Sequence, residues 1–480
     1  MLMEPEEVCS KVLEAITPTP EEEEEVLSIA RSIMDKLRSL LAEEGVEAVV
    51  RLEGSLAKGT WLRGEADVDI FVRLKPDVGR DFLKREFMRI ARRATEGYKQ
   101  VERYAEHPYL ECWAGGVRIN LVPCYDVEKG NWLSATDRTP YHTDYVREHL
   151  PEELKGDVRL LKRFLKGIGA YGAEIKVGGF SGYLCELLII YYGGFLEALR
   201  GSMAWRRGTL IDLEGYYRGR EDEALEFFRH HLIVVDPVDP GRNVAAPVRL
   251  EKMCSFMAAA REFLSRPSED FFFPRRPAPP GQEELKSMVR GRGTSILALR
   301  LHVGGLVPDV LWGQLHRTMR GLSGSLREQG FRVLRAGAWS DEVAEAIILF
   351  ELEASELPPV VKKVGPPVWA GEHVERFLSK NMADPRLVCG PYIEGDRWVV
   401  LVRRRWPDAV GFLKAKLSEH GGRGIGVAPL LAQRVEEGFE LLSGEEVVRL
   451  CRGAEGFREF LAEFLRGRPT WLAGRGGQAP

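Results

Sequence analysis

The chain has 480 residues, which is too long for one ordinary hydrophobic core and predicts two to four domains. Hydrophobic residues make up 44% and charged residues 29%, as in a soluble globular protein, and the net charge of −4 excludes a wholly basic nucleic-acid-coating protein while permitting a local basic surface. The seven cysteines are scattered and never spaced C-x-x-C, which argues against a zinc site or a disulfide framework and predicts reduced thiols in the cytoplasm.

The first part of the chain alternates helices and strands. Its start is acidic and lacks a signal-peptide pattern. A helix is expected over 19–44, where Thr19 can cap the first turn, Pro20 suits the first helical position and Glu22 completes a capping box. Two strands, a helix and a hairpin turned at Gly115-Gly116 are expected to follow, over 46–53, 66–73, 80–96 and 109–123.

Two aspartates stand in the second of these strands, about a dozen residues after a Gly54-Ser55 turn. Asp67 and Asp69 are two apart, so both project from one face of the strand, and the apolar residues beside them face the other way. Two adjacent carboxylates repel each other, and a divalent cation removes that repulsion. A Gly-Ser turn supplies backbone N–H groups and a hydroxyl for phosphate oxygens. Together these features indicate phosphoryl or nucleotidyl transfer.

The remainder of the chain predicts further helices and strands. A segment containing Asp137-Arg138-Thr139-Pro140-Tyr141-His142 is expected to be irregular, and 236–244 a turn-rich loop. The most apolar stretch, 183–199, contains two glutamates, so it predicts a buried helix and no membrane span. Other helices are expected over 157–168 and 248–265. After a proline-rich linker at 273–281, strands and helices alternate up to a Gly-rich tail, 473–480, that is expected to be mobile; these strands are placed at 295–301, 330–336, 345–352 and 397–403, and the helices at 310–329, 371–380, 408–418 and 444–465.

The Gly-Ser and Asp-x-Asp pattern resembles the nucleotidyltransferase superfamily that includes DNA polymerase beta and the template-independent tRNA-tailing enzymes. Further motifs, in order along nearly the whole chain, narrow the resemblance to the archaeal class I CCA-adding enzyme family. They are Gly-Ser-x-Ala-Lys-Gly-Thr-Trp-Leu (54–62), Tyr-Ala-Glu-His-Pro-Tyr (104–109), Val-Pro-Cys-Tyr (122–125), Asp-Arg-Thr-Pro (137–140), Tyr-Gly-Ala-Glu (171–174), Gly-Phe-Ser-Gly-Tyr-Leu-Cys-Glu-Leu-Leu (179–188), Asp-Pro-Val-Asp (236–239), Leu-Trp-Gly-Gln-Leu (311–315), Gly-Phe-Arg-Val-Leu-Arg (330–335) and Phe-Glu-Leu-Glu (350–353).

The resemblance implies a multidomain α/β (α+β) fold. Its parts would be a polymerase-beta-like palm over 1–150, a helical neck that recognises the nucleotide over 151–270, and a mixed α/β body and tail over 271–480 that binds tRNA. The implied activity is template-independent addition of C, C and A to the 3′ end of tRNA from CTP and ATP, with Mg²⁺. Two metal ions would take part in catalysis, one activating the terminal ribose hydroxyl and the other holding the triphosphate.

The resemblance also assigns roles to single residues. Asp67 and Asp69 would hold the metals. Ser55 and Lys58 would contact the triphosphate, although the family often has arginine at position 58 and lysine lacks its bidentate geometry. Arg242 would read the base edge. The remaining nucleotide-binding positions are Gly54, Thr139, His142, Lys162 and Tyr171. By residue pattern alone, Lys162 is more often a solvated lysine, Tyr171 a core residue at a helix end, and His142 a loop histidine.

One position departs from the family pattern. The family usually carries a third carboxylate, which ligates a metal, where this chain has Asn120. Asn120 can coordinate through its carbonyl, but it brings no charge. If the hairpin turns at Gly115-Gly116, antiparallel register places Glu111 directly opposite Asn120 on the same face. We therefore hypothesise that Glu111 supplies the missing charge; an exposed strand glutamate is an equally good interpretation.

Two alternatives remain open at this stage. One is a poly(A)-type or other RNA nucleotidyltransferase, and the other is a catalytically impaired tRNA-binding relative, suggested by Asn120. Arginines and aromatic residues in 285–340 fit an RNA-backbone surface, although they also fit ordinary solvated helix faces. The expected partners are tRNA, ATP and CTP, with no membrane. The sequence does not set the oligomeric state, and a homodimer is compatible with it.

Overall fold

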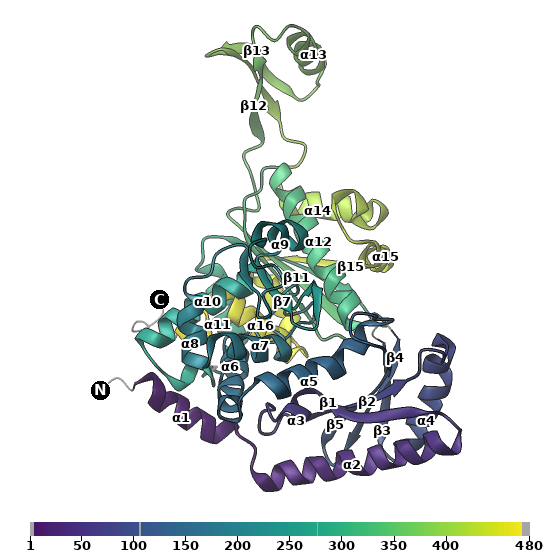
Figure 1. The fold of residues 1–480 in the computed structure, drawn as a ribbon. Coiled ribbons are helices and arrows are strands. Elements are labelled where there is room, and N and C mark those ends of the chain that lie inside the picture. The colour runs from purple at the N-terminus through teal and green to yellow at the C-terminus, as the bar shows by residue number, and fades with distance from the viewer. Residues whose placement is uncertain (1–3, 105–106, 276, 473–480) are drawn as a thin grey trace. The chain divides into compact units, whose positions relative to one another are not determined.

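The computed structural model describes residues 4–104, 107–275 and 277–472. The chain forms two compact units, one of Met1–Arg276 with the segment from Pro469 on, and one of Pro277–Arg468. The mixed α/β class is confirmed (Figure 1). The finer division into 1–150, 151–270 and 271–480 stays a prediction. The expected mobile tail, 473–480, and the middle of the Tyr104–Tyr109 motif, 105–106, lie outside the described residues.

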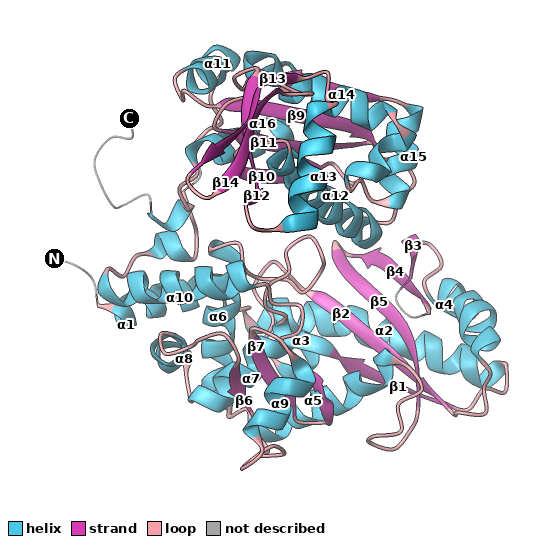
Figure 2. Cartoon of the chain, turned by 90° about the horizontal axis from the view of Figure 1, so that it is seen from above, coloured by secondary structure: helices cyan, strands magenta, loops and turns pink. Residues whose placement is uncertain are grey.

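A five-stranded sheet forms the centre of the N-terminal part, in the order β1-β2-β5-β4-β3. Its middle pair, β2 and β5, is parallel and the other pairs are antiparallel (Figure 2). Four of the strands were predicted; β3, a polar edge strand, was not. The bounds are β1 Ala48–Glu53, β2 Asp67–Leu74, β3 Lys99–Tyr104, β4 Pro108–Ala114 and β5 Val117–Tyr125.

One face of this sheet is apolar, and the other carries the polar residues beside a small apolar cluster of Phe71, Val122 and Cys124. Val68 and Ile70 are fully buried in a core that helix α2 (Pro20–Glu43) and helix α4 (Phe87–Ala94) cover. Helix α2 begins at the predicted cap, because Thr19 and Glu22 form the expected capping box. Figure 1 shows α2 running along the sheet. Since strand side chains alternate, this packing turns the two aspartates of β2 to the opposite face.

The predicted irregular segment at 137–142 is helical. A 3-10 turn, Ala135–Arg138, leads into helix α5, Thr139–His149. Asp137 is fully buried and accepts backbone N–H bonds from Tyr125 at 2.8 Å, Leu133 at 2.9 Å and Ser134 at 2.6 Å, which fastens the preceding loop to the sheet. Sequence periodicity did not indicate this helix, because α5 buries only Pro140, Thr143 and Val146 and so has a weak apolar stripe.

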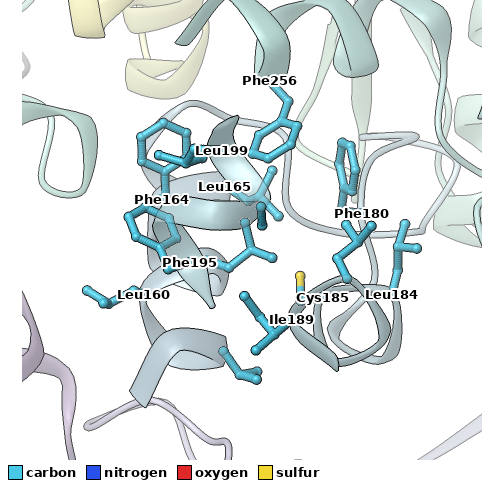
Figure 3. Close-up of a cluster of buried hydrophobic side chains, with 14 of the residues drawn as sticks. Leu160, Phe164, Leu165, Phe180, Leu184, Cys185, Ile189, Phe195, Leu199 and Phe256 are labelled. Atoms are coloured by element: carbon cyan, nitrogen blue, oxygen red, sulfur yellow. The ribbon is translucent and has the colours of Figure 1, made fainter. Parts of the chain in front are cut away.

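A helical part, the neck, continues the first unit around its own core. Aromatic rings from three of its helices interlock there, with Phe164 in edge contact with Phe195 and Phe256 (Figure 3). Phe164 also makes an edge contact with Phe263. The neck elements are α6 Lys155–Gly167, α7 Gly182–Tyr192, α8 Phe195–Ser202, α9 Glu221–Phe228 and α10 Leu250–Ser265, with short strands β6 Thr209–Ile211, β7 Leu232–Asp236 and β8 Asp239–Asn243. A first helix, α1 Pro5–Ile16, also packs into this core.

Two sequence expectations for the neck are corrected. The apolar stretch 183–199 forms two helices, α7 and α8, bent by 90° at a break that begins with Gly193 in a left-handed conformation (φ 79°). Among the described residues, no single helix is long and apolar enough to cross a membrane, and this bent pair meets the criterion by length and composition only. The segment 236–244 is a β-hairpin made by β7 and β8, because Asp236 pairs with Asp239.

The second unit contains two further sheets, of order β10-β11-β9-β15 and β12-β14-β13. Their strands are β9 Ser295–His302, β10 Val333–Ser340, β11 Glu345–Leu352, β12 Val360–Pro367, β13 Leu387–Glu394, β14 Arg397–Arg403 and β15 Phe439–Ser443. The helices are α11 Gln282–Arg290, α12 Pro308–Glu328, α13 Gly371–Met382, α14 Ala409–Ser418, α15 Pro429–Glu437 and α16 Glu455–Arg466. The helix expected over 444–465 is a 3-10 segment, Gly444–Cys451, followed by α16.

Candidate active site

The Gly-Ser turn lies against the second aspartate. Strand β1 ends at Glu53, directly opposite Asp69, and the short helix α3, Gly54–Lys58, begins there. Gly54 has φ +73°, and a Cβ at this position would lie 2.1 Å from Asp69 Oδ2. Only glycine therefore fits, because any side chain would have to displace the carboxylate. The turn and the Asp-x-Asp strand thus form one unit, as the sequence predicts.

Asp67 and Asp69 share the polar face of β2 but have different surroundings. Asp67 is held by the fork of Arg118, with Nε 2.8 Å from Oδ1 and Nη2 2.5 Å from Oδ2. Asp69 accepts a 2.9 Å bond from Asn120 Nδ2, because parallel register places Asn120 beside it. Burial raises the pKa of Asp69, and the charge of Asp67 raises it further. A carboxyl with this pKa is stabilised in its ionised form by a nearby cation.

The expected hairpin register is confirmed, and the expected third carboxylate is not formed. Glu111 lies directly opposite Asn120. Its carboxylate is not exposed; it is 3.1 Å from Arg103 Nη2 and 3.8 Å from Arg118 Nη1. Among the described residues, no group of three or more His, Cys, Asp or Glu side chains is placed to hold a metal ion. The arginines therefore engage Glu111, which does not complete a carboxylate cluster with Asp67 and Asp69.

The donors present fit one divalent cation better than two. Asp67 and Asp69 offer carboxylate oxygens on the same face, which suits a hard cation that also binds substrate phosphates. The third position offers only the amide of Asn120, whose nitrogen points to Asp69. Any cation that binds Asp67 must share that carboxylate with Arg118. A catalytic role for Asn120 or Glu111 stays a prediction.

A pocket of about 600 Å³ gathers four of the predicted site residues. Ser55, Asp67, Lys162 and Tyr171 all line it, together with Arg118. Its rim also carries acidic side chains, Glu22, Glu25 and Glu65. The other predicted residues do not line this pocket; they are Gly54, Lys58, Asp69, Glu111, Asn120, Thr139, His142 and Arg242.

A buried cluster beside this pocket joins the two predicted lysines. Glu186 of α7 is fully buried; its Oε2 is 2.5 Å from Lys58 Nζ and its Oε1 is 3.3 Å from Lys162 Nζ. Thr60 completes the cluster, since its hydroxyl donates to Glu186 Oε1 at 2.6 Å. Lys162 is 2% exposed, so the default interpretation of a solvated lysine, which assigned it to an outward helix face, is wrong.

The pKa values in this cluster reflect the balance between burial and charge. Burial lowers the pKa of Lys162, and Glu186 opposes that effect. Burial alone would raise the pKa of Glu186, but Lys58 and Lys162 outweigh it and lower the pKa. Burial also raises the pKa of Tyr171, a pocket residue that packs against the neck core.

A second cluster surrounds Asp236 at the end of β7. This fully buried carboxylate lies 2.9 Å from His142 Nε2 and 2.6 Å from Arg242 Nη1. Tyr183 donates to its other oxygen at 3.2 Å and stacks on His142 with ring centroids 4.1 Å apart. His142 lies within α5 and not in a loop, and burial lowers its pKa. Two predicted nucleotide-binding residues, His142 and Arg242, are thus fixed by one shared aspartate.

The clusters are adjacent, and Thr139 takes part in neither. Lys58 Nζ lies 5.7 Å from the centre of the Tyr183 ring, which connects the Glu186 cluster to the Asp236 cluster. Thr139 is the first residue of α5. Sequence patterns indicated no role for five further residues of these clusters and of the pocket: Thr60, Arg118, Tyr183, Glu186 and Asp236. The available signal was Glu186 itself, which is the lone charged residue in the apolar sequence of α7.

The prediction that the arginines of 285–340 form an RNA-backbone surface is corrected in part. Arg290, Arg300 and Arg332 pair with carboxylates, and Arg292 and Arg335 both bind Glu351, which is 3% exposed. These arginines hold the second unit together or are neutralised at its surface. Arg317, Arg320 and Arg327 are exposed on α12 and remain available for phosphates.

Comparison with known proteins covers nearly the whole chain. A nucleotidyltransferase domain matches residues 33–150, a tRNA nucleotidyltransferase second domain matches 156–273, and the C-terminal domain of the CCA-adding enzyme matches 292–444. The CCA-adding enzyme of Methanothermobacter thermautotrophicus is 37% identical over 463 residues, 95% of this chain and 97% of that relative. The Halobacterium salinarum enzyme is 40% identical over 92% of this chain and 94% of the relative. The chain belongs to the CCA-adding enzyme family.

Further relatives agree with this membership. The CCA-adding enzyme of Methanopyrus kandleri is 38% identical, with 97% of this chain and 98% of the relative covered. Among solved structures, the RNA terminal uridylyl transferase Cid1 gives a TM-score of 0.44 at 17% identity over 57% of this chain, a likeness too distant to indicate a function.

Proposed function

We propose that the protein adds C, C and A to the 3′ end of tRNA without a template, using CTP, ATP and Mg²⁺. The observation that carries the proposal is the unit of Gly54, Ser55, Asp67 and Asp69, built beside two buried lysines in a member of the CCA-adding enzyme family. Carboxylates for a cation and ammonium groups for a triphosphate are the equipment of nucleotidyl transfer.

Each group of residues has a task in this proposal. Asp67 and Asp69 hold Mg²⁺, which when bound neutralises phosphate charge and favours departure of pyrophosphate. Ser55, Lys162 and Tyr171 bind the triphosphate in the pocket, and Lys58 adds a second ammonium group. Arg242, held by Asp236, reads the base edge, since no template strand exists to choose the nucleotide.

The tRNA lies on a different set of residues. Arg317, Arg320 and Arg327 are exposed on α12 of the second unit and carry the positive charge that binds RNA phosphates. The seven free cysteines suit the reducing cytoplasm, where we place the protein.

The test uses tRNA that ends before CCA. Purified protein is incubated with Mg²⁺ and radiolabelled CTP or ATP, separately and together. Two additions from CTP alone and a third only when ATP is also present support the proposal. Repeated addition of A without C would instead indicate a poly(A)-type enzyme, and tRNA binding without any addition would indicate a catalytically impaired relative.

A further inference from the structure

The Glu186 cluster joins two parts of the first unit that are far apart in sequence. Lys58 and Thr60 follow the Gly-Ser turn, while Lys162 and Glu186 come from α6 and α7 of the neck. The other three side chains all bind the Glu186 carboxylate, and Lys162 Nζ also donates to the Thr60 carbonyl at 3.1 Å and its hydroxyl at 3.0 Å. Helix α7 packs directly beside Lys162, because a Cβ on Gly182 would be in ordinary van der Waals contact with its Cε, at 3.5 Å.

The charges in this cluster do not balance. Two ammonium groups face one carboxylate, and the exposed fractions of the three side chains are 7% for Lys58, 3% for Lys162 and 0% for Glu186. An excess of one positive charge at a buried site is costly unless an anion compensates it. Lys162 lines the pocket together with Ser55 and Asp67, so the excess charge is adjacent to the place proposed for the nucleotide.

Other charged groups near the cluster do not remove this excess. The charge of Lys58 acts on Asp69, but in the proposed site Asp69 and Asp67 would hold the cation, which would neutralise them. His142 and Arg242 belong to the Asp236 cluster, whose carboxylate they share. Cys185 and Tyr171, which lie beside Lys162, are kept neutral by burial because burial raises the pKa of both.

We infer that Glu186 is a positioning residue that holds Lys58 and Lys162 side by side toward the triphosphate of the incoming nucleotide. This inference rests on the proposed function, because it assigns the cluster to the same nucleotide site. Glu186 acts through the lysines and does not touch the nucleotide. The single Glu186 carboxylate reduces the repulsion between the two ammonium groups. It compensates only one of their two positive charges, and the other is left to bind the phosphates.

The decisive variant is Glu186→Gln, which keeps the shape and removes the charge. A glutamine presents an NH₂ group where one carboxylate oxygen now accepts, so it repels Lys58 or Lys162. We expect binding of Mg–CTP to weaken by about tenfold to a hundredfold, the worth of one charge-assisted bond. Binding of CMP is expected to change by less than about threefold, because CMP lacks the β- and γ-phosphates that the lysines bind.

The measurement is isothermal titration of CTP, CDP and CMP with Mg²⁺, beside KM and kcat for CTP and ATP. Both KM values are expected to rise by a similar factor, since the lysines contact phosphates and not the base. Glu197→Gln is the matched control, because Glu197 is an exposed neck glutamate paired with Arg200. It removes the same charge and is expected to leave CTP affinity unchanged.

Two further variants keep the test decisive. Combining Glu186→Gln with Lys58→Gln is expected to weaken CTP binding by less than the product of the single effects, because both changes remove one arrangement. If Glu186→Gln does not fold, Glu186→Asp retains the charge on a shorter arm and is expected to bind CTP with intermediate affinity. An equal loss of CTP and CMP affinity, or no loss of CTP affinity in folded Glu186→Gln, would overturn the inference.

The result separates this inference from the proposed function. If the wild-type protein binds CTP but extends no tRNA, the proposed function fails while the phosphate dependence of the Glu186→Gln effect still stands. If tRNA is extended normally by both proteins with equal KM, the positioning role fails while the proposed function stands.

Discussion

At the scale of single residues, the palm site is distinguished by Asn120 and Arg118. Asn120 has an amide where the family pattern has a carboxylate, and the guanidinium group of Arg118 is hydrogen-bonded to Asp67. Both features reduce the negative charge available to a divalent cation. The site is therefore expected to bind its metal weakly for a nucleotidyltransferase palm, because the charge of the ligands sets the affinity for hard cations.

Restoring the carboxylate is expected to strengthen metal binding. In Asn120→Asp, the new charge lies beside Asp69, so the concentration of Mg²⁺ or Mn²⁺ needed for half-maximal activity should fall by about tenfold. Titrating Mn²⁺ by electron paramagnetic resonance checks the same change without catalysis. Asn131→Asp, in a loop between β5 and α5, is the control. Unchanged metal affinity in Asn120→Asp would mean that this position does not contribute to the cation site.

Glu111 is expected to matter for stability more than for catalysis. Its carboxylate is bound by Arg103 and lies near Arg118, so Glu111→Gln leaves two guanidinium groups without their buried partner. We expect a loss of about 1–2 kcal/mol in the free energy of unfolding. The rate of nucleotide addition at saturating Mg²⁺ should stay within about threefold of wild type, since no aspartate loses a ligand. Chemical denaturation and single-turnover assays measure the two effects, and a large loss of rate with normal stability would restore the hypothesis of charge compensation.

At the scale of elements, the short helix α3 acts as a spacer between the sheet and the lysines. It carries Gly54 against Asp69 at one end and Lys58 against Glu186 at the other. A shift at either end therefore reaches both the proposed cation site and the proposed phosphate site. The turn tolerates no side chain at its first residue, which explains why the sequence has glycine there.

Gly54→Ala is expected to lower the rate of nucleotide addition by about a hundredfold while the protein still folds. Its Cβ would lie 2.1 Å from Asp69 Oδ2, so the carboxylate must move. A displacement of about 1 Å at reacting groups costs about a hundredfold in rate. Gly45→Ala is the matched control, because Gly45 also has a positive φ (+67°) but has no atom within 4 Å of its Cβ position. Both variants pay a similar conformational cost, so nucleotide addition compared at equal thermal stability isolates the contact with Asp69. Near-normal activity in Gly54→Ala would contradict this arrangement.

At the scale of the whole molecule, the two substrates are expected to bind different units. The nucleotide residues all lie in the first unit, and the exposed arginines of α12 lie in the second. The other five arginines of 285–340 are paired with carboxylates, whereas the three on α12 are exposed on one helix. A chain with a net charge of −4 can therefore still offer a local basic surface.

Neutralising that surface is expected to weaken tRNA binding alone. The variant with Arg317, Arg320 and Arg327 changed to Gln should raise KM for tRNA, and the slope of log affinity against log salt should fall by about two to three. KM for CTP should not change. A triple Gln variant of arginines that already pair with carboxylates, Arg290, Arg332 and Arg458, is the control. A change of equal size in that control would show that total charge matters and that α12 is not a specific surface.

Local pattern was enough to predict much of the palm. The same-face placement of Asp67 and Asp69 follows from the two-residue period of a strand, and the pairing of Glu111 with Asn120 follows from a two-glycine turn. The cap of α2 at Thr19 is equally local. Each of these features depends on residues close in sequence, so the local sequence was enough to specify it.

Which charged side chains meet one another depends on the tertiary fold. Lys58 and Glu186 are 128 residues apart, and Lys162 and Thr60 are 102 apart. Helical periodicity placed Lys162 on an outward face, yet packing against α7 buries it. Likewise, strand register placed Glu111 opposite Asn120, but the Glu111 carboxylate lies beside Arg103 and Arg118. The physical reason is that periodicity encodes which face of an element is buried, whereas the pairing of buried charges depends on which other element covers that face.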